Sequence, residues 1–589
     1  MGVTGMKDLV KESKTSDNFW FQNSQVIIDG PNLYYSLYFN SNPKMDQQHG
    51  GDYPAFTEQV RMFFTNLRRC NITALVVLDG GSEPGKEETV GARLKDKLQK
   101  AKRISESSAN QWDNILPPLV KDLFIQILQE LQIEMEQCFG EADLTAVLRA
   151  NERRCPILSN DSDFYIFDVQ EGFLSIDSFQ WQCETNVAIP ALRYRTSQFC
   201  DHFKVDRNHL PVFAAISGND YSRLEDRGAF SRRYPEPQQP GGYSAHRRRA
   251  ILRFLAGFKG KTSEEAVRAA LQLAGETQEE VIEHFLESTR KYALENPPRP
   301  NLPEWIIHEV HRGRLTSFVT SVLTQKSMTL TPLVEDFSKP SSYDASLRIR
   351  QFFYGLLVGT QPCKEYDRKE ADAVCAKEVT PVLPSVTPED LQRLELNNLN
   401  EAPEDLRCNV LYEALRCSRL DAESIPNHLK LPLCVTRFWF QYRQQNYPDH
   451  QTNMSCLQAL VLGFVYGEAD ADPEFKTRMD HLEPGGKRLQ LDVAHAFSQW
   501  QNCMRQSLHL NQLLSFPLPE PQCSRLYCGP LLHKLQNALL SHSRTFTELK
   551  VLLAERWRVL LETLLQSAGV GPSGDDEGWQ TQTRKKRRN

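Results

Sequence analysis

The first 220 residues alternate short apolar runs with amphipathic segments, and this alternation constrains the fold more strongly than any other feature. Four runs are candidate strands: SQVIID at 24–29, ALVVLD at 74–79, IEMEQCF at 133–139 and CPILSN at 155–160. Apolar residues recur at helical spacing within 56–67, 119–131 and 144–148. Strands that alternate with helices form a mostly parallel sheet with flanking helices. We therefore predict an α/β domain over residues 1–231.

The composition changes after this domain. Residues 232–246, RRYPEPQQPGGYSAH, are rich in Pro, Gly and Gln and predict a flexible loop. Residues 247–566 show mostly helical periodicity, for example at 491–508 and 549–565, and predict an α-rich C-terminal domain. Within it, residues 332–347 and 378–405 are candidate internal linkers. Residues 567–589 predict a disordered basic tail.

The bulk composition is that of a globular, intracellular protein. Apolar residues make up 40% and charged residues 24% of the chain, and its 14 cysteines include no CxxC pair that would indicate a zinc ribbon. No apolar run is long enough to span a bilayer, so we expect no membrane contact, and we expect no nucleotide cofactor. The net charge of -6 means that any nucleic-acid binding depends on local basic patches.

One such patch ends the chain and resembles a nuclear localisation signal, which predicts a nuclear protein. A basic tail that is simply solvated is the alternative interpretation. The cluster consists of Arg584, Lys585, Lys586, Arg587 and Arg588.

Acidic side chains follow each candidate strand. The carboxyl ends of parallel strands meet at one edge of a sheet, which is where open α/β folds place their sites. Singly, each acid has an ordinary explanation as a turn residue or as part of a helix N-terminus. Together, so many carboxylates would repel one another unless a cation lay between them. Oxygen ligands suit magnesium or manganese, and two ions roughly 3.5–4 Å apart would support phosphodiester hydrolysis. The acids are Asp29, Asp79, Glu141, Asp143, Asp161, Asp163 and, after a later apolar run, Asp220.

Several motifs resemble one nuclease superfamily. VIIDG, VVLDGG, GEAD, NDSDF and SGNDY occur in that order and are similar to the flap-endonuclease superfamily, also called the XPG-type 5′ nucleases. HGGDYPAF, CFGEAD, SNDSDF and DSFQW resemble its asteroid branch more closely. The resemblance covers roughly residues 1–225 and implies a PIN/flap-endonuclease-like fold. It also implies that the seven acids bind two metal ions, with Gly2 close to them.

The same resemblance implies cationic and aromatic contacts to DNA. Lys86 and Arg93 follow Asp79 by seven and fourteen residues, where the family carries cations that touch the scissile phosphate. Arg93, Lys97 and Lys100 share one helix face that would follow a phosphate backbone, although for Lys97 and Lys100 ion pairs on a solvated face are an equal alternative. Tyr35 matches a base-stacking position; Tyr34 and simple core packing are the alternatives.

The chain departs from the family pattern after Asp220. YSRLEDRGAFSRRYPEPQQPGG stands where the family has a glycine-containing helix-turn-helix, and the stretch between Arg103 and Glu141 is short for a full arch. The polarity of cleavage is therefore open, and single-stranded DNA or a 3′ overhang is an alternative to a 5′ flap. A basic run that opens the next helix offers another backbone contact. It consists of Arg247, Arg248 and Arg249.

Three functions fit these observations. The leading prediction is a magnesium-dependent, structure-selective DNA endonuclease that acts on single-stranded DNA, overhangs or flaps in DNA repair, including the processing of double-strand-break ends, with repair proteins as partners. Lys86 and Arg93 would offset charge on the phosphoryl oxygens. The alternatives are a catalytically silent scaffold for DNA ends or repair proteins, and an RNase.

Overall fold

The structure, a computed structural model, describes residues 2–81, 87–108, 113–182, 187–235, 242–369, 373–418, 425–469, 472–480, 488–540, 546–551 and 553–569. The chain forms two compact units, each interrupted in sequence. Unit 1 comprises Met1–Leu37, Gln59–Val90 and Ile127–Gly313, and unit 2 comprises Tyr38–Glu58, Gly91–Gln126 and Arg314–Asn589. These boundaries differ from the predicted ones, because residues 247–313 group with the sheet-containing unit and 91–126 with the helical one.

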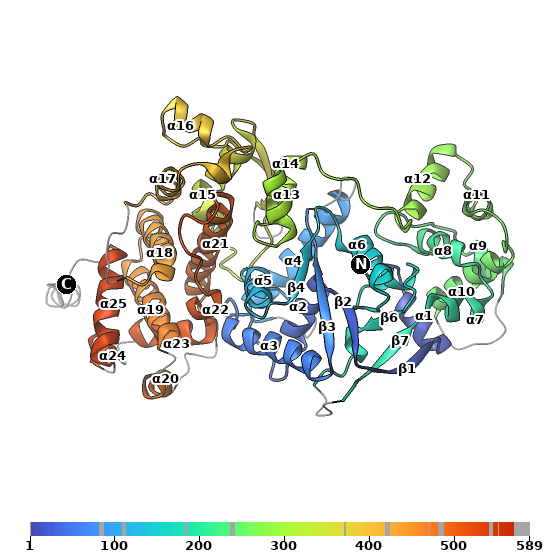
Figure 1. Ribbon diagram of the computed structural model, residues 1–589, viewed down its shortest axis with the longest axis horizontal. Helices are drawn as coiled ribbons and strands as arrows, with labels where there is room; N and C mark the ends of the chain where they lie inside the picture. Colours follow the sequence, from blue (N-terminus) through green and yellow to red (C-terminus); the bar gives the residue numbers. More distant parts are fainter. Residues whose placement is uncertain are drawn as a thin grey trace, which may run out of the picture. The chain divides into compact units, whose positions relative to one another are not determined.

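A seven-stranded mixed sheet forms the centre of unit 1 (Figure 1). Its strand order is β1-β7-β6-β5-β2-β3-β4; β2, β3, β4, β5 and β6 pair in parallel, whereas β7 pairs antiparallel with β6 and β1. The strands are β1 (Ser16–Phe21), β2 (Ser24–Asp29), β3 (Ile72–Leu78), β4 (Glu134–Gln137), β5 (Ile157–Ser159), β6 (Phe173–Ser175) and β7 (Ile189–Tyr194).

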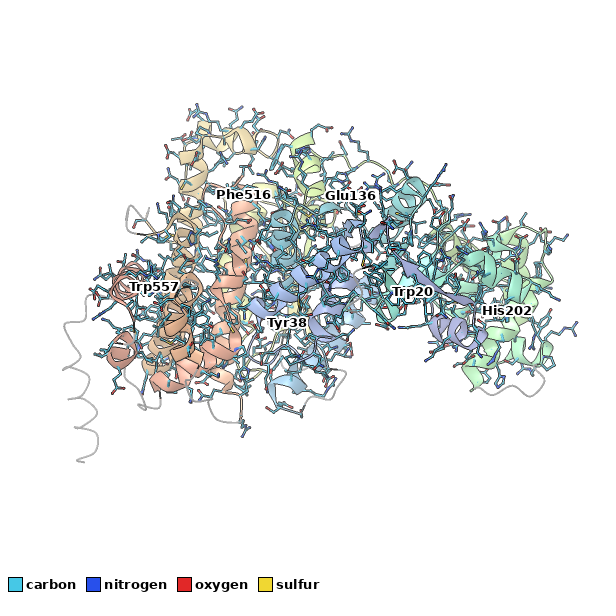
Figure 2. The ribbon with its side chains drawn as sticks, turned by 60° about the horizontal axis from the view of Figure 1, so that its bottom comes forward. Trp20, Tyr38, Glu136, His202, Phe516 and Trp557 are labelled. Carbon is cyan, nitrogen blue, oxygen red and sulfur yellow. The ribbon has the colours of Figure 1, made fainter. Side chains whose placement is uncertain are left out.

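All four predicted strands are confirmed, as β2, β3, β4 and β5. In β2 and β3 the apolar residues from Val26 to Ile28 and from Leu75 to Leu78 are buried on successive positions, as expected where both faces of a parallel strand are covered. The helix α6 (Ala142–Arg153) packs against both strands. The antiparallel edge formed by β1 and β7 was not predicted. Its edge strand exposes 63% of Trp20, so its burial pattern resembles that of a surface segment (Figure 2).

Some helices of unit 1 contact this sheet, and others follow it in the chain and pack on one another. The unit contains α1 (Met6–Ser13), α6, α7 (Thr196–Phe203), α8 (Leu210–Ser217), α9 (Ala229–Arg233), α10 (Tyr243–Ala256), α11 (Ser263–Ala274), α12 (Glu279–Arg290), α13 (Glu304–His311) and the 3-10 turns η1 (Ser162–Tyr165), η2 (Ile176–Ser178) and η3 (Arg207–His209). Four helices cross from one unit to the other: α2 (Gly30–Phe39), α3 (Tyr53–Arg69), α4 (Glu87–Ser105) and α5 (Val120–Glu130).

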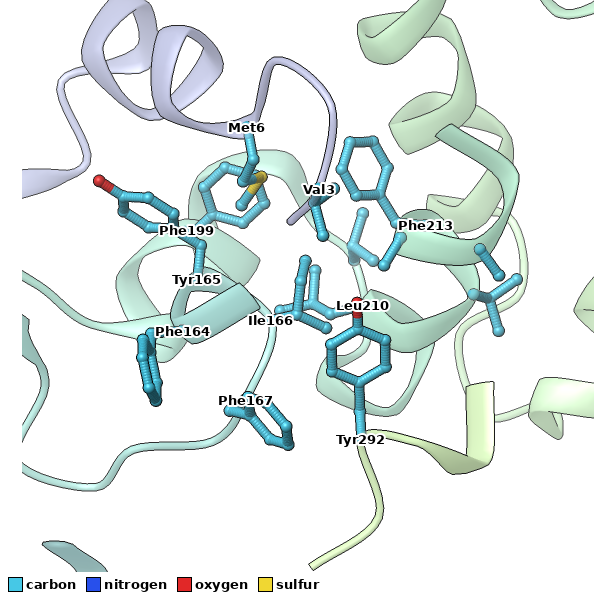
Figure 3. Packing of buried hydrophobic residues seen from close by; sticks show 14 of the residues in the cluster. Val3, Met6, Phe164, Tyr165, Ile166, Phe167, Phe199, Leu210, Phe213 and Tyr292 are labelled. Atoms are coloured by element: carbon cyan, nitrogen blue, oxygen red, sulfur yellow. The ribbon is translucent and has the colours of Figure 1, made fainter. Parts of the chain in front are cut away.

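A hydrophobic core joins the N-terminal helix to the helices that follow the sheet. Val3 and Met6 pack with residues of η1, α7 and α8, and the ring of Tyr292 lies in the same cluster beside Ile166 and Leu210 (Figure 3). Residues more than 100 positions apart in the chain are therefore held against η1, which carries Asp163.

Unit 2 is predominantly helical, as predicted for the C-terminal half. It contains α14 (Phe318–Gln325), α15 (Leu347–Val358), α16 (Pro388–Arg393), α17 (Glu404–Ala414), α18 (Asn427–Asn446), α19 (His450–Glu468), α20 (Pro473–Asp480), α21 (Leu491–Leu513), α22 (Cys523–Leu526), α23 (Gly529–Leu540), α24 (Phe546–Val551), α25 (Glu555–Ser567), η4 (Ser342–Ser346) and η5 (Leu399–Glu401). The long helices α18, α19 and α21 pack on one another (Figure 1). The predicted helical stretch 549–565 is divided between α24 and α25.

Unit 2 also holds a small sheet, which the sequence analysis did not predict. Its order is β10-β9-β8, with β8 (Ser327–Thr329), β9 (Cys363–Arg368) and β10 (Val374–Val379). This sheet has no clear apolar pattern, because some of its buried residues are charged. Glu365 on β9, for example, is buried and pairs with the guanidinium of Arg350 at 2.5 Å. Burial of such a pair cannot be read from hydrophobic periodicity.

The predicted loop and linkers are more ordered than expected where they are described. In the predicted loop 232–246, Arg232 and Arg233 end α9 and Tyr243 begins α10, while residues 236–241 lie outside the described residues. The predicted linker 332–347 contains η4, whose Ser342 is fully buried. The linker 378–405 contains α16 and η5. Of the predicted tail 567–589, only 567–569 are described.

Candidate metal centre

Three of the predicted acids form a compact cluster in unit 1. Asp143, Asp161 and Asp163 each offer one carboxylate oxygen, and these oxygens all lie within 4.8 Å of one another. Asp143 lies in the first turn of α6, Asp161 caps η1, and Asp163 lies within η1. All three follow the carboxyl ends of β4 and β5, as the strand pattern predicted.

The local sequence LSNDSD shapes one side of this cluster. The Oδ1 atom of Asp161 accepts the backbone N–H of Asp163 at 3.1 Å, which begins the 3-10 turn. The backbone N–H of Asp161 in turn donates to Oγ of Ser159 at 2.9 Å. The two carboxylates are therefore set by a capped turn rather than by a free loop.

Ser159 connects this turn to the end of the neighbouring strand. Its hydroxyl donates to Oδ2 of Asp29 at 2.6 Å, and Asn32 donates to the same carboxylate from its backbone and side-chain nitrogens at 3.1 and 2.6 Å. Asp29 is 4% exposed. Desolvation, followed by the charge of Asp79, raises the pKa of Asp29 to about 7.

Asp79 and Glu141 lie at the start of α6. Oδ1 of Asp79 accepts the backbone N–H of Ala142 at 2.9 Å, so the acid after β3 holds the first turn of the helix that carries Asp143. Glu141 is the residue that precedes α6, and its Oε2 accepts the hydroxyl of Tyr221 at 3.2 Å. The acids that follow β3 and β4 therefore hold, respectively, the first turn of α6 and the side chain of Tyr221.

The electrostatics of the cluster indicate an excess of negative charge. Desolvation and then the charges of Asp161, Asp163, Asp29 and Asp79 raise the pKa of Asp143 well above its ordinary value. For Asp163, desolvation and the charges of Asp161 and Asp220 raise the pKa to about 7. Six aspartates therefore influence one another, and all their donor atoms are carboxylate oxygens. This donor set fits magnesium or manganese, which would remove the repulsion.

A tyrosine from far along the chain completes the surroundings of Asp163. Tyr292, just after α12, donates its hydroxyl to Oδ1 of Asp163 at 2.7 Å, and Asn219 contacts the same hydroxyl at 3.4 Å. Asn219 also accepts the backbone N–H groups of Tyr221 and Ser222 at 2.9 and 2.8 Å, which shapes the turn that carries Asp220.

The sequence analysis missed Ser159, Tyr221 and Tyr292. Ser159 and Tyr221 stand next to predicted ligands, and a serine at the end of a strand beside an acid pair is a recognisable signal. The sequence contains no signal for Tyr292, because this residue follows Asp163 by 129 residues and only the fold places the two side by side.

Gly2 lies where the resemblance implied. Its φ is +52°, and a Cβ atom at this position would collide with Oγ of Ser162 and Oδ1 of Asp161. The first residues of the chain therefore approach the cluster by backbone alone, which only glycine permits without strain.

Three of the predicted cations, Arg93, Lys97 and Lys100, lie on α4. Arg93, Lys97 and Lys100 belong to unit 2, and Lys86 lies outside the described residues. Desolvation and the charges of Arg93 and Lys100 lower the pKa of Lys97, so the three cations form one basic face. Lys100 also pairs with Asp96 at 2.8 Å, which agrees with the ion-pair alternative for this residue. Their contact with DNA stays a prediction.

The predicted stacking residue, Tyr35, lies on the surface of α2. Tyr35 lies on α2 and is 43% exposed, whereas Tyr34 is half-buried. Simple core packing therefore applies less well to Tyr35 than to its neighbour, and stacking on a base stays a prediction.

The basic run that opens α10 has internal partners. Arg247 pairs with Asp226 at 2.8 Å and donates to the carbonyl of Leu224, and Arg249 contacts Glu12 at 3.2 Å. Arg248 packs against Gly5. Because Arg248 and Arg249 are each only 8% exposed, this run differs from the predicted surface contact and braces α10 instead.

Comparisons with known proteins agree with the motifs. The family models described as Asteroid N-terminal domain and XPG domain containing match residues 472–567 and 96–236. A protein from Danio rerio named single-strand DNA endonuclease ASTE1 is 34% identical, over 91% of this chain and 81% of its own length. The Homo sapiens protein of the same name is 31% identical, over 92% of this chain and 86% of its own length.

Solved structures provide a more distant comparison. Human GEN1 in complex with Holliday junction DNA is 13% identical, covers 70% of this chain and 96% of its own, and has a TM-score of 0.31. In the described part of this chain, no helix combines the length and apolar character needed to cross a membrane. The predicted nuclear localisation residues 584–588 lie outside the described residues.

Proposed function

This chain belongs to the asteroid family, and on that premise we propose that it is a structure-selective DNA endonuclease acting on single-stranded DNA, overhangs or flaps. The observation that carries the proposal is the cluster of Asp143, Asp161 and Asp163, whose carboxylate oxygens lie within 4.8 Å of one another. The name of its relatives, single-strand DNA endonuclease ASTE1, supports the choice of substrate.

The proposed cofactor is magnesium, with manganese as the alternative, bound as two ions. The three clustered aspartates, together with Asp29, Asp79, Glu141 and Asp220, would hold them. When bound, such cations act as Lewis acids on a phosphoryl oxygen and offset the charge that develops during hydrolysis.

The residues of the chain position these ligands. Ser159 keeps Asp29 and the backbone of Asp161 in a fixed relation, and Tyr292 orients Asp163. Such hydrogen bonds to ligating carboxylates fix the ligand orientation and tune its basicity. In the proposal Lys86 and Arg93 contact the scissile phosphate, and Tyr35, Lys97 and Lys100 contact the strand.

The cellular role is also proposed. The basic residues 584–588 support nuclear import, and a nuclear endonuclease for single strands suits DNA repair, including the processing of double-strand-break ends with repair proteins as partners.

The test is a cleavage assay on matched, end-labelled substrates. Wild-type protein is incubated with single-stranded, 3′-overhang, 5′-flap and blunt DNA and with single-stranded RNA of the same sequence, in magnesium, manganese or EDTA. We expect cleavage of DNA that carries a single-stranded segment, only with a divalent cation. Cleavage of RNA alone, or unchanged cleavage in EDTA, would contradict the proposal.

A further inference from the structure

A surface pocket in unit 2 has the features of an anion site. It has a volume of about 230 Å³ and is bounded by η4, the first turns of α15, the residue Arg416 after α17, and α18. These elements can be followed in Figure 1, where α15, α17 and α18 are labelled. The pocket shares no residue with the aspartate cluster.

Two arginines give the pocket its charge. Arg348 and Arg416 both line it, and the single carboxylate among its lining residues is that of Asp344. In the described residues, no ion pair joins either arginine to a carboxylate. The nearby Glu413 carboxylate is occupied by the backbone N–H and the hydroxyl of Ser385, at 3.0 and 2.7 Å. The lining therefore carries two arginine charges against the single carboxylate of Asp344, while the charge of Glu413 acts on Arg348 from beside the pocket.

One carbonyl group brings the backbone of Arg416 and the guanidinium of Arg348 together. The carbonyl oxygen of Glu413 accepts the backbone N–H of Arg416 at 3.1 Å and Nη2 of Arg348 at 3.2 Å. The guanidinium of Arg348 also lies over the ring of Phe352, 4.8 Å from its centroid. The charge of Arg416 contributes, after desolvation, to lowering the pKa of Arg348. Two like charges close enough to act on each other favour a shared anionic ligand.

The remaining wall is aromatic and amide-bearing. Phe438, Gln441, Tyr442 and Gln445 line the pocket from one face of α18, at the spacing i, i+3, i+4, i+7. A planar ring can stack on Tyr442, and glutamine amides both donate and accept hydrogen bonds, as the edge of a nucleobase requires. Gln351 on α15 also lines the pocket and donates a hydrogen bond of 2.9 Å to the carbonyl of Thr380.

We propose that this pocket binds a nucleoside monophosphate, with its phosphate between Arg348 and Arg416 and its base against Tyr442. The volume of about 230 Å³ is below the roughly 300–1,000 Å³ of pockets that enclose drug-sized ligands, which limits the ligand to a single small unit. The same chemistry is offered by a free mononucleotide and by the phosphorylated end of a DNA strand. The inference does not depend on the nuclease activity proposed above.

The first experiment is isothermal titration of the full chain in EDTA with thymidine 5′-monophosphate, thymidine and inorganic phosphate. We expect the monophosphate to bind at least about tenfold more tightly than either fragment, and Arg348→Gln and Arg416→Gln each to weaken it about tenfold. Arg393→Gln is the matched control, because Arg393 is exposed on α16 outside the pocket. Equal binding of the three ligands, or of the wild type and both pocket variants, would overturn the proposal.

A second arm identifies the source of the ligand. Single-stranded oligothymidine with a 5′-phosphate, a 3′-phosphate or no phosphate is titrated in EDTA against wild type, Arg416→Gln and Tyr442→Ala. A preference for a phosphorylated end that both variants lose assigns the pocket to strand ends. No such preference, with retained monophosphate binding, assigns it to free nucleotides. Absence of both kinds of binding would overturn the proposal, whatever the cleavage assay shows.

Discussion

The hydroxyl of Tyr292 donates a hydrogen bond of 2.7 Å to Oδ1 of Asp163, although 129 residues separate the two in the chain. The ring of Tyr292 is anchored in the same hydrophobic core as Val3 and Leu210. A segment beyond the sheet therefore reaches back to orient one carboxylate of the proposed metal centre.

Replacement of Tyr292 by phenylalanine keeps the ring and removes this hydrogen bond. We expect about a tenfold increase in the magnesium concentration needed for half-maximal cleavage, because partners of ligating carboxylates contribute about 10–100-fold to metal affinity. The measurement is the cleavage rate across a magnesium titration. Tyr343→Phe is the control, since it also removes a buried tyrosine hydroxyl, which donates to the backbone carbonyl of Thr331 at 3.0 Å and lies in unit 2. Identical titration curves for the wild type and Tyr292→Phe would show that the hydroxyl has no such role.

The pH dependence of stability follows from the raised pKa values. Folding raises the pKa of Asp29 and of Asp163 from 3.8 to about 7. The folded state thus favours the protonated acids, and their contribution to the stability of metal-free protein is lost as pH rises from about 4 through 7. A bound cation would offset the repulsion between the ionised aspartates, which is greatest at high pH. We expect magnesium to raise Tm more at pH 8 than at pH 5.5, as measured by thermal unfolding. An equal Tm increase at both pH values would contradict this reasoning.

Asp143→Asn separates stability from activity. Because neighbouring aspartates and desolvation disfavour the charge of Asp143, its neutral amide should raise Tm of the metal-free protein at pH 8 while cleavage is lost. Asp177→Asn is the matched control, because Asp177 is exposed and pairs with Lys7 at 2.5 Å. Thermal unfolding in EDTA and a cleavage assay together test the prediction. A lower Tm for Asp143→Asn than for the wild type would show that the charge of Asp143 does not destabilise the metal-free protein.

The basic face of α4 can be tested through salt dependence. Lys97→Gln should weaken DNA binding and reduce the slope of log Kd against log salt by about one, because one phosphate contact is lost. Lys95 lies on the same helix but outside the stripe of Arg93, Lys97 and Lys100, so Lys95→Gln is the control. Binding is measured by fluorescence anisotropy in EDTA. Equal slopes of log Kd against log salt for the two variants would show that Lys97 does not contact a DNA phosphate.

The residues differ in how far the sequence alone predicts them. Asp29, Asp143, Asp161 and Asp163 were predictable because strand ends meet at one edge of a parallel sheet, a rule that needs only local patterns. Tyr292 was not, because its relation to Asp163 depends on tertiary packing. The edge strand β1 was missed since Trp20 is exposed and its pairing with β7 is non-local.

The basic run of α10 shows the opposite failure. Three consecutive arginines predicted a surface contact, yet Arg247 is paired with Asp226, and Arg248 and Arg249 are buried. A run of arginines binds anionic groups, but its sequence does not show whether these are phosphates or acids within the protein. The fold decides between the two.

Asp161→Ala shows whether the aspartate cluster is needed for DNA cleavage. Single-turnover cleavage of labelled single-stranded DNA in magnesium is compared with the wild type, and binding of the same strand is measured in parallel in EDTA. We expect a loss of cleavage to background with binding retained within about twofold, since in the proposed function this side chain holds the metal and not the strand. Cleavage by Asp161→Ala at the wild-type rate would contradict it.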